Sequence, residues 1–594
     1  MSEKEIAWDL SKIFSSCDDP KITETINALL EDADDIIKEY KGKINITNFT
    51  AQNLHDLLEK QEKILADVEE IKIFSENKFY ANMTLLETKA LYNKFKDFHS
   101  SILKKLAFLE INIGKLIDEN PRLIDDETIS NYKNYLVKIR RKFPFKLSES
   151  EEKLILEKDQ YGANAWQQLK ESWLSSRKFK VTVEGKEKMV SLSESNSLRW
   201  HPDRETRISA TKSVFGSIEK EIEIYASALR NICGDWVKIT NHRGYKNPIH
   251  HSLIKNEITH VIIDNLMKIV EENVSIYHRF LKIKAKLLNL PKLNGVDTWA
   301  YLPSEKKYTW DETKKLILQI YDNFDKSFGD IVSDLFNKNH IDASTREGKL
   351  GAGYCFPWYN GKSAHILISF KGLLSDIHTL AHEFGHAAHY YLSSQEQTFF
   401  NYMPGLVIDE IGGIFGELLM YDALLETIDS TNEKIILLTN RLSTEGGAIF
   451  LVSASMWFEQ NLYDAIEKGE YLDGNTISKY WCAARDKIFG DSVEWFDEMK
   501  WNWVVVPHFY FPHDRFYNYP YAYAQLFVYA LYQTYKKEGE SFVPKFKKLL
   551  SAGSNLSPEE LGKIVGLDIT KPDFWKLGMK QYEEFIDELE KLTK

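Results

Sequence analysis

One short segment constrains the fold of this chain more than any other. HTLAHEFGHAAHYYL (378–392) contains the pattern H-E-x-x-H at His382, Glu383 and His386. Residues four apart lie one above the other on an α-helix, so both imidazoles reach a single metal ion if the segment is helical. Glu383 then projects about a quarter-turn away, where a carboxylate can take a proton from a water beside the metal. The segment therefore predicts a long helix that carries two metal ligands and a general base.

A second helical segment offers a third ligand. VIDEIGGIFGELLMYDALL (407–425) carries Glu410 on a helix whose other face is apolar. Glu417 lies seven residues later and shares that face, so we expect it to accept a hydrogen bond from a ligand histidine. Asp409 points to another side of the helix and is the weaker ligand candidate. Three glycines would let the helix approach a neighbouring helix closely: Gly412, Gly413 and Gly416.

The remaining two histidines of the first segment have other interpretations. His378 precedes His382 by four residues and can reach the same face, yet one helix rarely supplies three ligands to one tetrahedral ion. We therefore expect His378 to support the site indirectly or to cap the helix. His389 is interpreted as a packed or hydrogen-bonded helix histidine.

A tyrosine-rich segment near the C-terminus allows two interpretations. VVVPHFYFPHDRFYNYPYAYAQLFVYALY (504–532) holds His508 and His513 among many aromatic rings. Most of these rings are expected to be hydrophobic core. An enzyme that hydrolyses amides also needs neutral donors aimed at the oxyanion of the tetrahedral intermediate, and histidine and tyrosine suit that role. We expect the segment to face the site.

The rest of the chain is mostly helical in pattern. PKITETINALLEDADDIIKEY (20–40) has an apolar stripe with helical spacing and is preceded by Asp18 and Asp19 as candidate caps. KFKVTVEGKEKMVSL (178–192) alternates around a Glu-Gly turn and predicts a hairpin, and GKLGAGYCFPWYNGKSAHILISF (348–370) predicts further strands. The sequence thus predicts a mainly α protein with a small sheet just before the histidine-rich helix. We place a domain boundary between 1–195 and 196–594.

Composition excludes several classes of partner. The 594 residues include 76 Lys and Arg against 88 Asp and Glu, which gives a net charge of −12 and makes nucleic acid an unsuitable partner. Four separated cysteines form no C-x-x-C pair and fit reduced thiols of a cytoplasmic protein. The start MSEKEIAWDL lacks the pattern of a signal peptide, and no uninterrupted apolar run reaches bilayer length. We expect a cytoplasmic protein without a membrane partner.

Several of these segments resemble one known family. TLAHEFGHAAH (379–389) is similar to the zinc helix of the oligoendopeptidase F family, a branch of the thimet-oligopeptidase-like zinc metallopeptidases, and DEIGGIFGEL (409–418) resembles its third-ligand helix. The histidine-tyrosine segment also resembles its counterpart in the family. Further similar stretches extend the resemblance over nearly the whole chain: WDLSKIFSSCDDPKI (8–22), HPDRETR (201–207) and ALRNICGDWVKITNHRGYKNP (228–248).

The resemblance implies a two-lobed, helical zincin-type fold with a small β-sheet at the edge of a deep substrate channel. The channel would admit short unstructured peptides, and the glycine-rich strand region would pair with the extended substrate. One Zn²⁺ per chain would be bound by His382, His386 and Glu410, while Glu383 activates the attacking water. The implied activity is zinc-dependent endopeptidase cleavage of oligopeptides, that is, peptide degradation.

The resemblance also implies which residues assist the reaction. His508, Tyr517 and Tyr519 are the best matches for groups that stabilise the oxyanion or contact substrate, with His513 as an alternative to His508. Two other functions remain to be compared with this one. A catalytically silent peptide-binding protein would keep the cleft without the chemistry, although here all three ligands and the base are present. In the third interpretation the same metal site removes single terminal residues, which product mapping would reveal.

Overall fold

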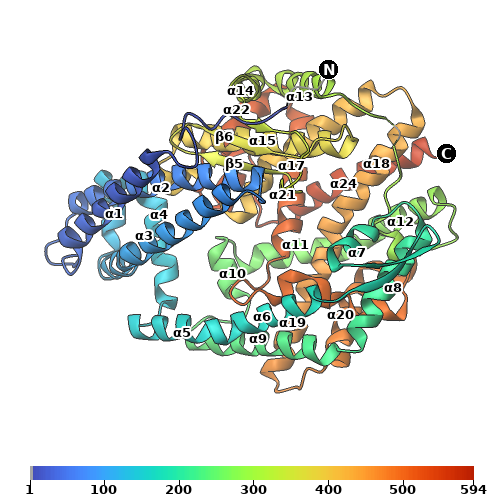
Figure 1. The fold of residues 1–594 in the computed structure, drawn as a ribbon, viewed down its shortest axis with the longest axis horizontal. Helices are drawn as coiled ribbons and strands as arrows, with labels where there is room; N and C mark the ends of the chain where they lie inside the picture. The colour runs from blue at the N-terminus through green and yellow to red at the C-terminus, as the bar shows by residue number, and fades with distance from the viewer. Residues whose placement is uncertain (1–4, 305) are drawn as a thin grey trace. The chain divides into compact units, whose positions relative to one another are not determined.

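Helices make up most of the structure, a computed structural model that describes residues 5–304 and 306–594 (Figure 1). The predicted mainly α fold is confirmed. The first four residues of the segment used to judge a signal peptide lie outside the described residues. Helix α1 (Pro20–Tyr40) shows why the pattern works: the Asp19 side chain accepts the backbone N–H of Lys21 at 3.0 Å, and Ile22, Ile26, Leu29, Ala33, Ile36 and Tyr40 are buried. The cap satisfies an otherwise unpaired donor, and the stripe packs into the core.

The chain forms two units, each assembled from three stretches of sequence. The first unit comprises Met1–Pro144, Glu305–Thr427 and Thr534–Asp568, and the second comprises Phe145–Ser304, Ile428–Gln533 and Ile569–Lys594. The domain division expected from the sequence follows chain order and stays a prediction.

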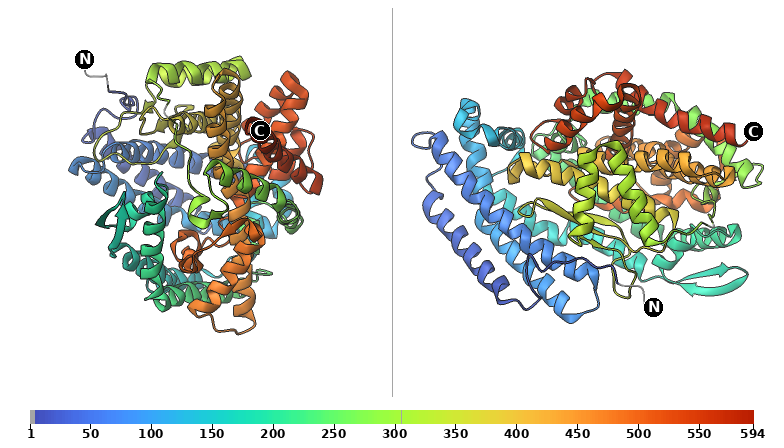
Figure 2. Two further views of the ribbon diagram at one scale, coloured as in Figure 1. Left: turned by 90° about the vertical axis from the view of Figure 1, so that its right-hand side faces the viewer. Right: turned by 90° about the horizontal axis from the view of Figure 1, so that it is seen from above.

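The first unit contains a helical layer and the sheet that precedes the histidine-rich helix. Its long N-terminal helices pack side by side, as the blue ribbons of Figure 2 show. The helices of this unit are α1, α2 (Ala51–Ala81), α3 (Leu86–Glu119), α4 (Lys133–Lys142), α13 (Trp310–Phe324), α14 (Lys326–Asn337), α15 (Leu374–Glu396), α16 (Phe399–Tyr402), α17 (Leu406–Thr427), α22 (Val543–Ser551) and α23 (Pro558–Ile564).

Three strands of the first unit form one small sheet, as the glycine-rich region predicts. Strand β6 (Ser363–Leu367) is fully buried at the centre, between β4 (Ile341–Asp342), which runs parallel to it, and β5 (Tyr354–Trp358), which runs antiparallel. Strand β5 is therefore an edge strand. Both β5 and β6 contact α15, so the sheet supports the helix that carries the metal-binding pattern.

The second unit is also helical, with the predicted hairpin and a two-stranded parallel pair. Strands β1 (Phe179–Val183) and β2 (Lys186–Val190) pair antiparallel around a Glu184-Gly185 turn in which both residues have positive φ. Strands β3 (Leu293–Asn294) and β7 (Val493–Glu494) pair parallel. The helices are α5 (Glu149–Tyr161), α6 (Ala163–Ser175), α7 (Leu192–Leu198), α8 (Arg204–Glu219), α9 (Ile222–His242), α10 (His250–Lys255), α11 (His260–Glu272), α12 (Val274–Leu287), α18 (Thr431–Gly446), α19 (Val452–Glu467), α20 (Gly474–Phe489), most of α21 (Tyr519–Glu538) and α24 (Pro572–Leu592).

One helical stretch of the second unit, Thr431–Glu467, is long and apolar enough to cross a membrane by length and composition. Its most apolar window is 67% buried inside the protein, as in the core helix of a soluble protein. This stretch is therefore weak evidence for a membrane, and the expected absence of a membrane partner stays a prediction.

Candidate active site

The candidate site is built on the contact between α15 and α17. Asp376 starts α15 by accepting the backbone N–H groups of Lys371 at 2.6 Å and Leu373 at 2.9 Å. The two helices then approach so closely that a Cβ added to Gly385 would overlap the carbonyl of Gly412. The close approach that the glycines of α17 predict is confirmed, and it brings the polar residues of both helices together.

Three candidate ligand atoms converge at this contact. His382 Nε2 lies 3.0 Å from His386 Nε2, and Glu410 Oε2 lies 3.3 Å from the first nitrogen and 3.6 Å from the second. A Cβ added to Gly413 would stand 2.6 Å from the ring of His382, so glycine at this position leaves the imidazole its room. The helix spacing and the small residues together place the three side chains around one point.

The distances between these atoms fit a metal ion. A tetrahedral zinc ion with bonds of about 2.1 Å holds its ligand atoms about 3.4 Å apart, close to the observed 3.0, 3.3 and 3.6 Å. Two imidazole nitrogens and one carboxylate oxygen are also the donor set of many catalytic zinc sites. His382, His386 and Glu410 can therefore hold such an ion with little rearrangement.

Glu417 orients the first of these histidines. His382 Nδ1 lies 2.7 Å from Glu417 Oε1, so a proton on Nδ1 donates to the carboxylate and leaves Nε2 with its lone pair toward the metal position. The other carboxylate oxygen lies 3.1 Å from His378 Nε2. Although burial alone would raise the pKa of Glu417, the two histidines hold it well below its ordinary value. His378 thus supports the site through Glu417, as the sequence predicts.

A second carboxylate lies behind His386. Asp409 Oδ1 is 4.0 Å from His386 Nδ1 and accepts the hydroxyl of Tyr390 at 2.9 Å. Burial raises the pKa of Asp409, and the positive charge that His386 can carry opposes that rise. Asp409 is outside the group of convergent ligand atoms, so it is placed to polarise the second histidine.

Glu383 is buried next to the ligand pair, with 6% of its surface exposed. Burial raises its pKa, while the neighbouring histidines lower it. A Cβ added to Gly353, just before β5, would stand 3.4 Å from Glu383 Oε1, so the strand region passes close to this carboxylate. A carboxylate with a raised pKa is well matched to accepting and returning a proton near neutral pH.

His389 takes no part in this cluster. It is fully buried, its ring stacks on Tyr390, and burial lowers its pKa to about 3. It is the packed helix histidine that the sequence predicts.

The histidine-tyrosine segment belongs to the second unit. His508 Nδ1 lies 2.7 Å from Asn518 Oδ1, which leaves Nε2 for another partner, and the His508 ring packs 4.8 Å from that of Tyr517. Buried Arg515 anchors the segment by donating to the carbonyl of Phe509 at 2.5 Å. His508 and Tyr517 are partly exposed and adjacent.

The other two candidates of this segment are placed differently. The Tyr519 hydroxyl is buried, accepts the amide of Asn256 at 2.9 Å and lies 3.1 Å from the Ser252 hydroxyl. Burial raises the pKa of Tyr519 to about 12. His513 is exposed and lies 3.0 Å from Asn164 Oδ1. Of these four candidates, Tyr519 is buried with partners of its own, whereas His508 and Tyr517 are partly exposed and His513 is exposed.

Comparison with known families shows which family the chain belongs to. The model of peptidase family M3 matches residues 197–581, and the model of oligopeptidase F matches residues 119–179. The chain belongs to peptidase family M3. The predicted resemblance to oligoendopeptidase F is confirmed, and the chain is a peptidase.

Relatives of this M3 peptidase match over almost their whole length. Oligopeptidase PepF of Bacillus subtilis is 24% identical over 599 residues, covering 99% of this chain and 87% of that protein. A crystal structure of a Chlamydophila abortus protein described as a peptidase superposes with a TM-score of 0.85 at 22% identity, covering 100% of this chain and 99% of the other. Oligoendopeptidase F from Enterococcus faecium superposes with a TM-score of 0.69 at 20% identity, covering 97% and 99%. These structures share the fold of this M3 peptidase.

One contributor to the site was underestimated from the sequence. The sequence predicts that Asp409 points to another side of the helix than Glu410. Asp409 does lie outside the ligand cluster, yet it comes within 4.0 Å of His386 Nδ1. The available signal is the position of Asp409 directly before Glu410, because adjacent helix residues project about 100° apart and both can face the same neighbouring helix.

The contact between Glu417 and His382 predicts a loss of metal affinity in this M3 peptidase. Glu417→Gln keeps the shape but replaces the charged acceptor, so we expect zinc affinity to fall about 10–100-fold. Competition with a chelator of known affinity measures the change. Glu426→Gln, an exposed position on the same helix, is the matched control and is expected to bind zinc normally. Equal affinities in the two variants would contradict the orienting role.

Proposed function

We propose that this M3 peptidase is a zinc-dependent endopeptidase that cleaves internal bonds of short peptides. The observation that carries the proposal is the convergence of His382, His386 and Glu410 beside the buried Glu383. The two histidines and Glu410 would hold one zinc ion per chain. When bound, zinc supplies Lewis-acid chemistry, which acidifies a water and polarises the scissile carbonyl.

The side chains around this position divide the remaining work. Glu383 accepts the proton of the attacking water and later delivers it to the departing amine nitrogen. Glu417 keeps His382 in the tautomer that presents Nε2, and Asp409 favours the same state of His386. Glu417 acts through a hydrogen bond of 2.7 Å to His382, whereas Asp409 acts on His386 through its charge from 4.0 Å.

His508 and Tyr517 are assigned to the oxyanion that forms during attack. Their donors suit that charge, and the hydrogen bond from His508 Nδ1 to Asn518 leaves Nε2 available. Tyr519, whose hydroxyl accepts a hydrogen bond from Asn256, is assigned an indirect role. It supports the segment that carries His508 and Tyr517 and does not itself donate to the oxyanion.

Short unstructured peptides are the proposed substrates. The relatives are called oligopeptidase and oligoendopeptidase, and edge strand β5 offers unpaired backbone groups that an extended peptide can meet. Four free cysteines and the acidic composition fit a cytoplasmic enzyme of peptide degradation with no nucleic-acid partner.

Product mapping tests the mode of cleavage. A library of peptides from four to thirty residues, together with one folded protein, is incubated with the enzyme and analysed by mass spectrometry. We expect cuts at internal bonds, confined to short members, with the folded protein intact. Ladders that lose one terminal residue at a time would assign the site to an exopeptidase, and no cleavage at all would favour a silent peptide-binding protein.

A further inference from the structure

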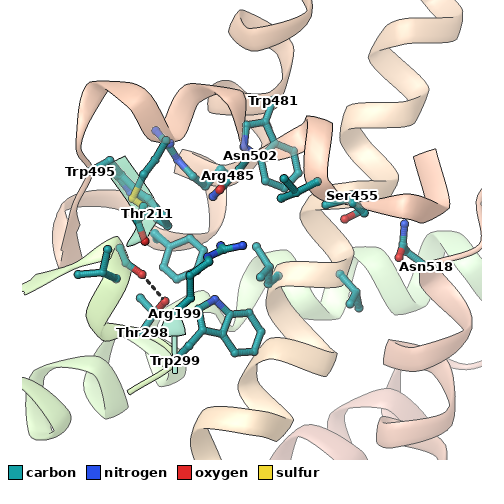
Figure 3. Close-up of a pocket in the computed structure, with 18 of the residues that line it drawn as sticks. Arg199, Thr211, Thr298, Trp299, Ser455, Trp481, Arg485, Trp495, Asn502 and Asn518 are labelled. Atoms are coloured by element: carbon teal, nitrogen blue, oxygen red, sulfur yellow. Dashed lines mark hydrogen bonds between the residues drawn. The ribbon is translucent and has the colours of Figure 1, made fainter. Parts of the chain in front are cut away.

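The second unit contains a cavity of about 320 Å³ that the metal chemistry does not use (Figure 3). Its walls come from distant parts of the sequence, among them the turn after α7, the start of α19, the end of α20 and the His508 segment. Indole rings supply much of the lining: Trp200, Trp299, Trp481 and Trp495. The cavity is therefore largely apolar and has the size of a small organic group.

The charges of this cavity have one sign. Arg199 and Arg485 line it, and none of its lining residues, all in the described part of the chain, is an aspartate or glutamate. Asp486 holds Arg485 at 2.8 Å, and the Arg485 guanidinium stacks 4.2 Å above Trp495. The charge of Arg485 is thus already neutralised. A cavity lined by arginines without a carboxylate is nevertheless unusual in a protein whose net charge is −12.

Arg199 has no such partner. Its side chain projects into the cavity in Figure 3, and the described residues place no carboxylate within ion-pair distance of it. Its guanidinium lies 5.3 Å from the ring of Phe215. Burial lowers the pKa of Arg199 to about 10, so the group is still charged at neutral pH. A partly buried guanidinium without a counter-ion is ready to bind a planar anion through two parallel hydrogen bonds.

Further polar atoms of the wall also lack partners among the described residues. The indole nitrogens of Trp481 and Trp495 and the amide nitrogen of Asn518 are buried donors without a hydrogen bond. Asn518 uses its oxygen for His508, so only its N–H₂ group remains. Asn502 Oδ1 is a buried acceptor without a hydrogen bond. Among these buried atoms the donors outnumber the acceptor, and together with the Arg199 guanidinium they suit a ligand rich in acceptor oxygens.

We propose that this cavity binds the carboxylate of a peptide together with an apolar side chain of the same peptide. Arg199 binds the carboxylate, and the tryptophans enclose the apolar side chain. The inference rests on the proposed function only in naming a peptide as the ligand. The carboxylate can come from the free C-terminus of a peptide or from an acidic side chain. Because Asn518 also positions His508, the cavity adjoins the segment to which we assign the oxyanion.

Calorimetric binding of small probes to the zinc-loaded Glu383→Gln protein tests this inference without turnover. The probes are N-acetyl-leucyl-phenylalanine, its C-terminal amide, and N-acetyl-glutamyl-phenylalanine amide. A charge-assisted contact predicts that an acid binds about tenfold or more tightly than the neutral amide. The acid that binds, C-terminal or side-chain, identifies the source of the carboxylate.

Substitution of Arg199 distinguishes binding in this cavity from binding at the metal, which also attracts carboxylates. Adding Arg199→Gln should remove the tenfold preference, and Arg199→Lys should restore part of it by returning the charge without the paired donors. Arg122→Gln, at an exposed position of the first unit, is the matched control and should bind like the parent. Thermal unfolding establishes that each variant is folded.

Equal binding of acids and neutral amide, or a preference that survives Arg199→Gln in a folded protein, would overturn the inference. Neither result would contradict the proposal of metal-dependent cleavage, because the probes report binding alone. Conversely, an enzyme that cleaves without zinc would overturn the proposed function and leave an Arg199-dependent preference standing.

Discussion

Glu383→Gln is expected to bind zinc normally and to lose about 10²–10⁴-fold in kcat. Glu383 is buried beside the two histidines, yet it is not one of the three residues whose ligand atoms converge. Glutamine has nearly the same shape and can still accept a hydrogen bond from water, but it cannot carry the proton to the departing amine. The variant should therefore keep the metal and the substrate while the chemical step fails.

Metal analysis and steady-state kinetics with one fluorogenic peptide measure the two halves of this prediction. Glu396→Gln, an exposed position near the end of α15, controls for loss of a charge from the same helix and should retain full activity. If Glu383→Gln cleaved the peptide at a near-normal rate, Glu383 would not be the base. Loss of zinc along with activity would make Glu383 a ligand instead.

Gly385→Ala should destabilise the protein by about 3 kcal/mol and weaken zinc binding. The added methyl group would overlap the Gly412 carbonyl and stand 2.9 Å from Gly413 Cα. Backbone atoms cannot turn aside as a flexible side chain can, so α15 and α17 must separate. That movement carries Glu410 away from the two histidines, and stability and metal affinity should fall together.

Chemical denaturation and chelator competition measure these effects. Gly234→Ala is the matched control, because Gly234 lies within α9 and an added Cβ there meets nothing within 4 Å. That variant should be as stable as the parent or more stable by up to about 1 kcal/mol, since alanine favours helix. A Gly385→Ala protein as stable as its control would show that the close helix contact is not required.

Local patterns in the sequence predict the centre of the site well. The spacing of His382 and His386 requires a helix, and the glycines of α17 require close packing, so both features arise from rules that act within a few residues or along one helix face. Glu417 follows from the same reasoning, and the structure places it 2.7 Å from His382.

Features that depend on tertiary packing could not be predicted in this way. Tyr517 and Tyr519 look alike in sequence, yet only the structure shows that Tyr519 is buried against Asn256. The cavity around Arg199 combines segments more than 200 residues apart, from Arg199 to Asn518, and no periodicity links them. Each of the two units is likewise assembled from separate stretches of sequence. A domain boundary inferred from a change of pattern along the chain is a single position and cannot describe such a division.

The central claim is that one zinc ion at His382, His386 and Glu410 is required for peptide cleavage. The most direct measurement is to remove the metal with a chelator, dialyse, and titrate zinc back while following cleavage and bound metal together. We predict that the metal-free protein is inactive and that activity returns in proportion to zinc until one ion is bound per chain. Undiminished cleavage by protein that contains no metal would contradict the account.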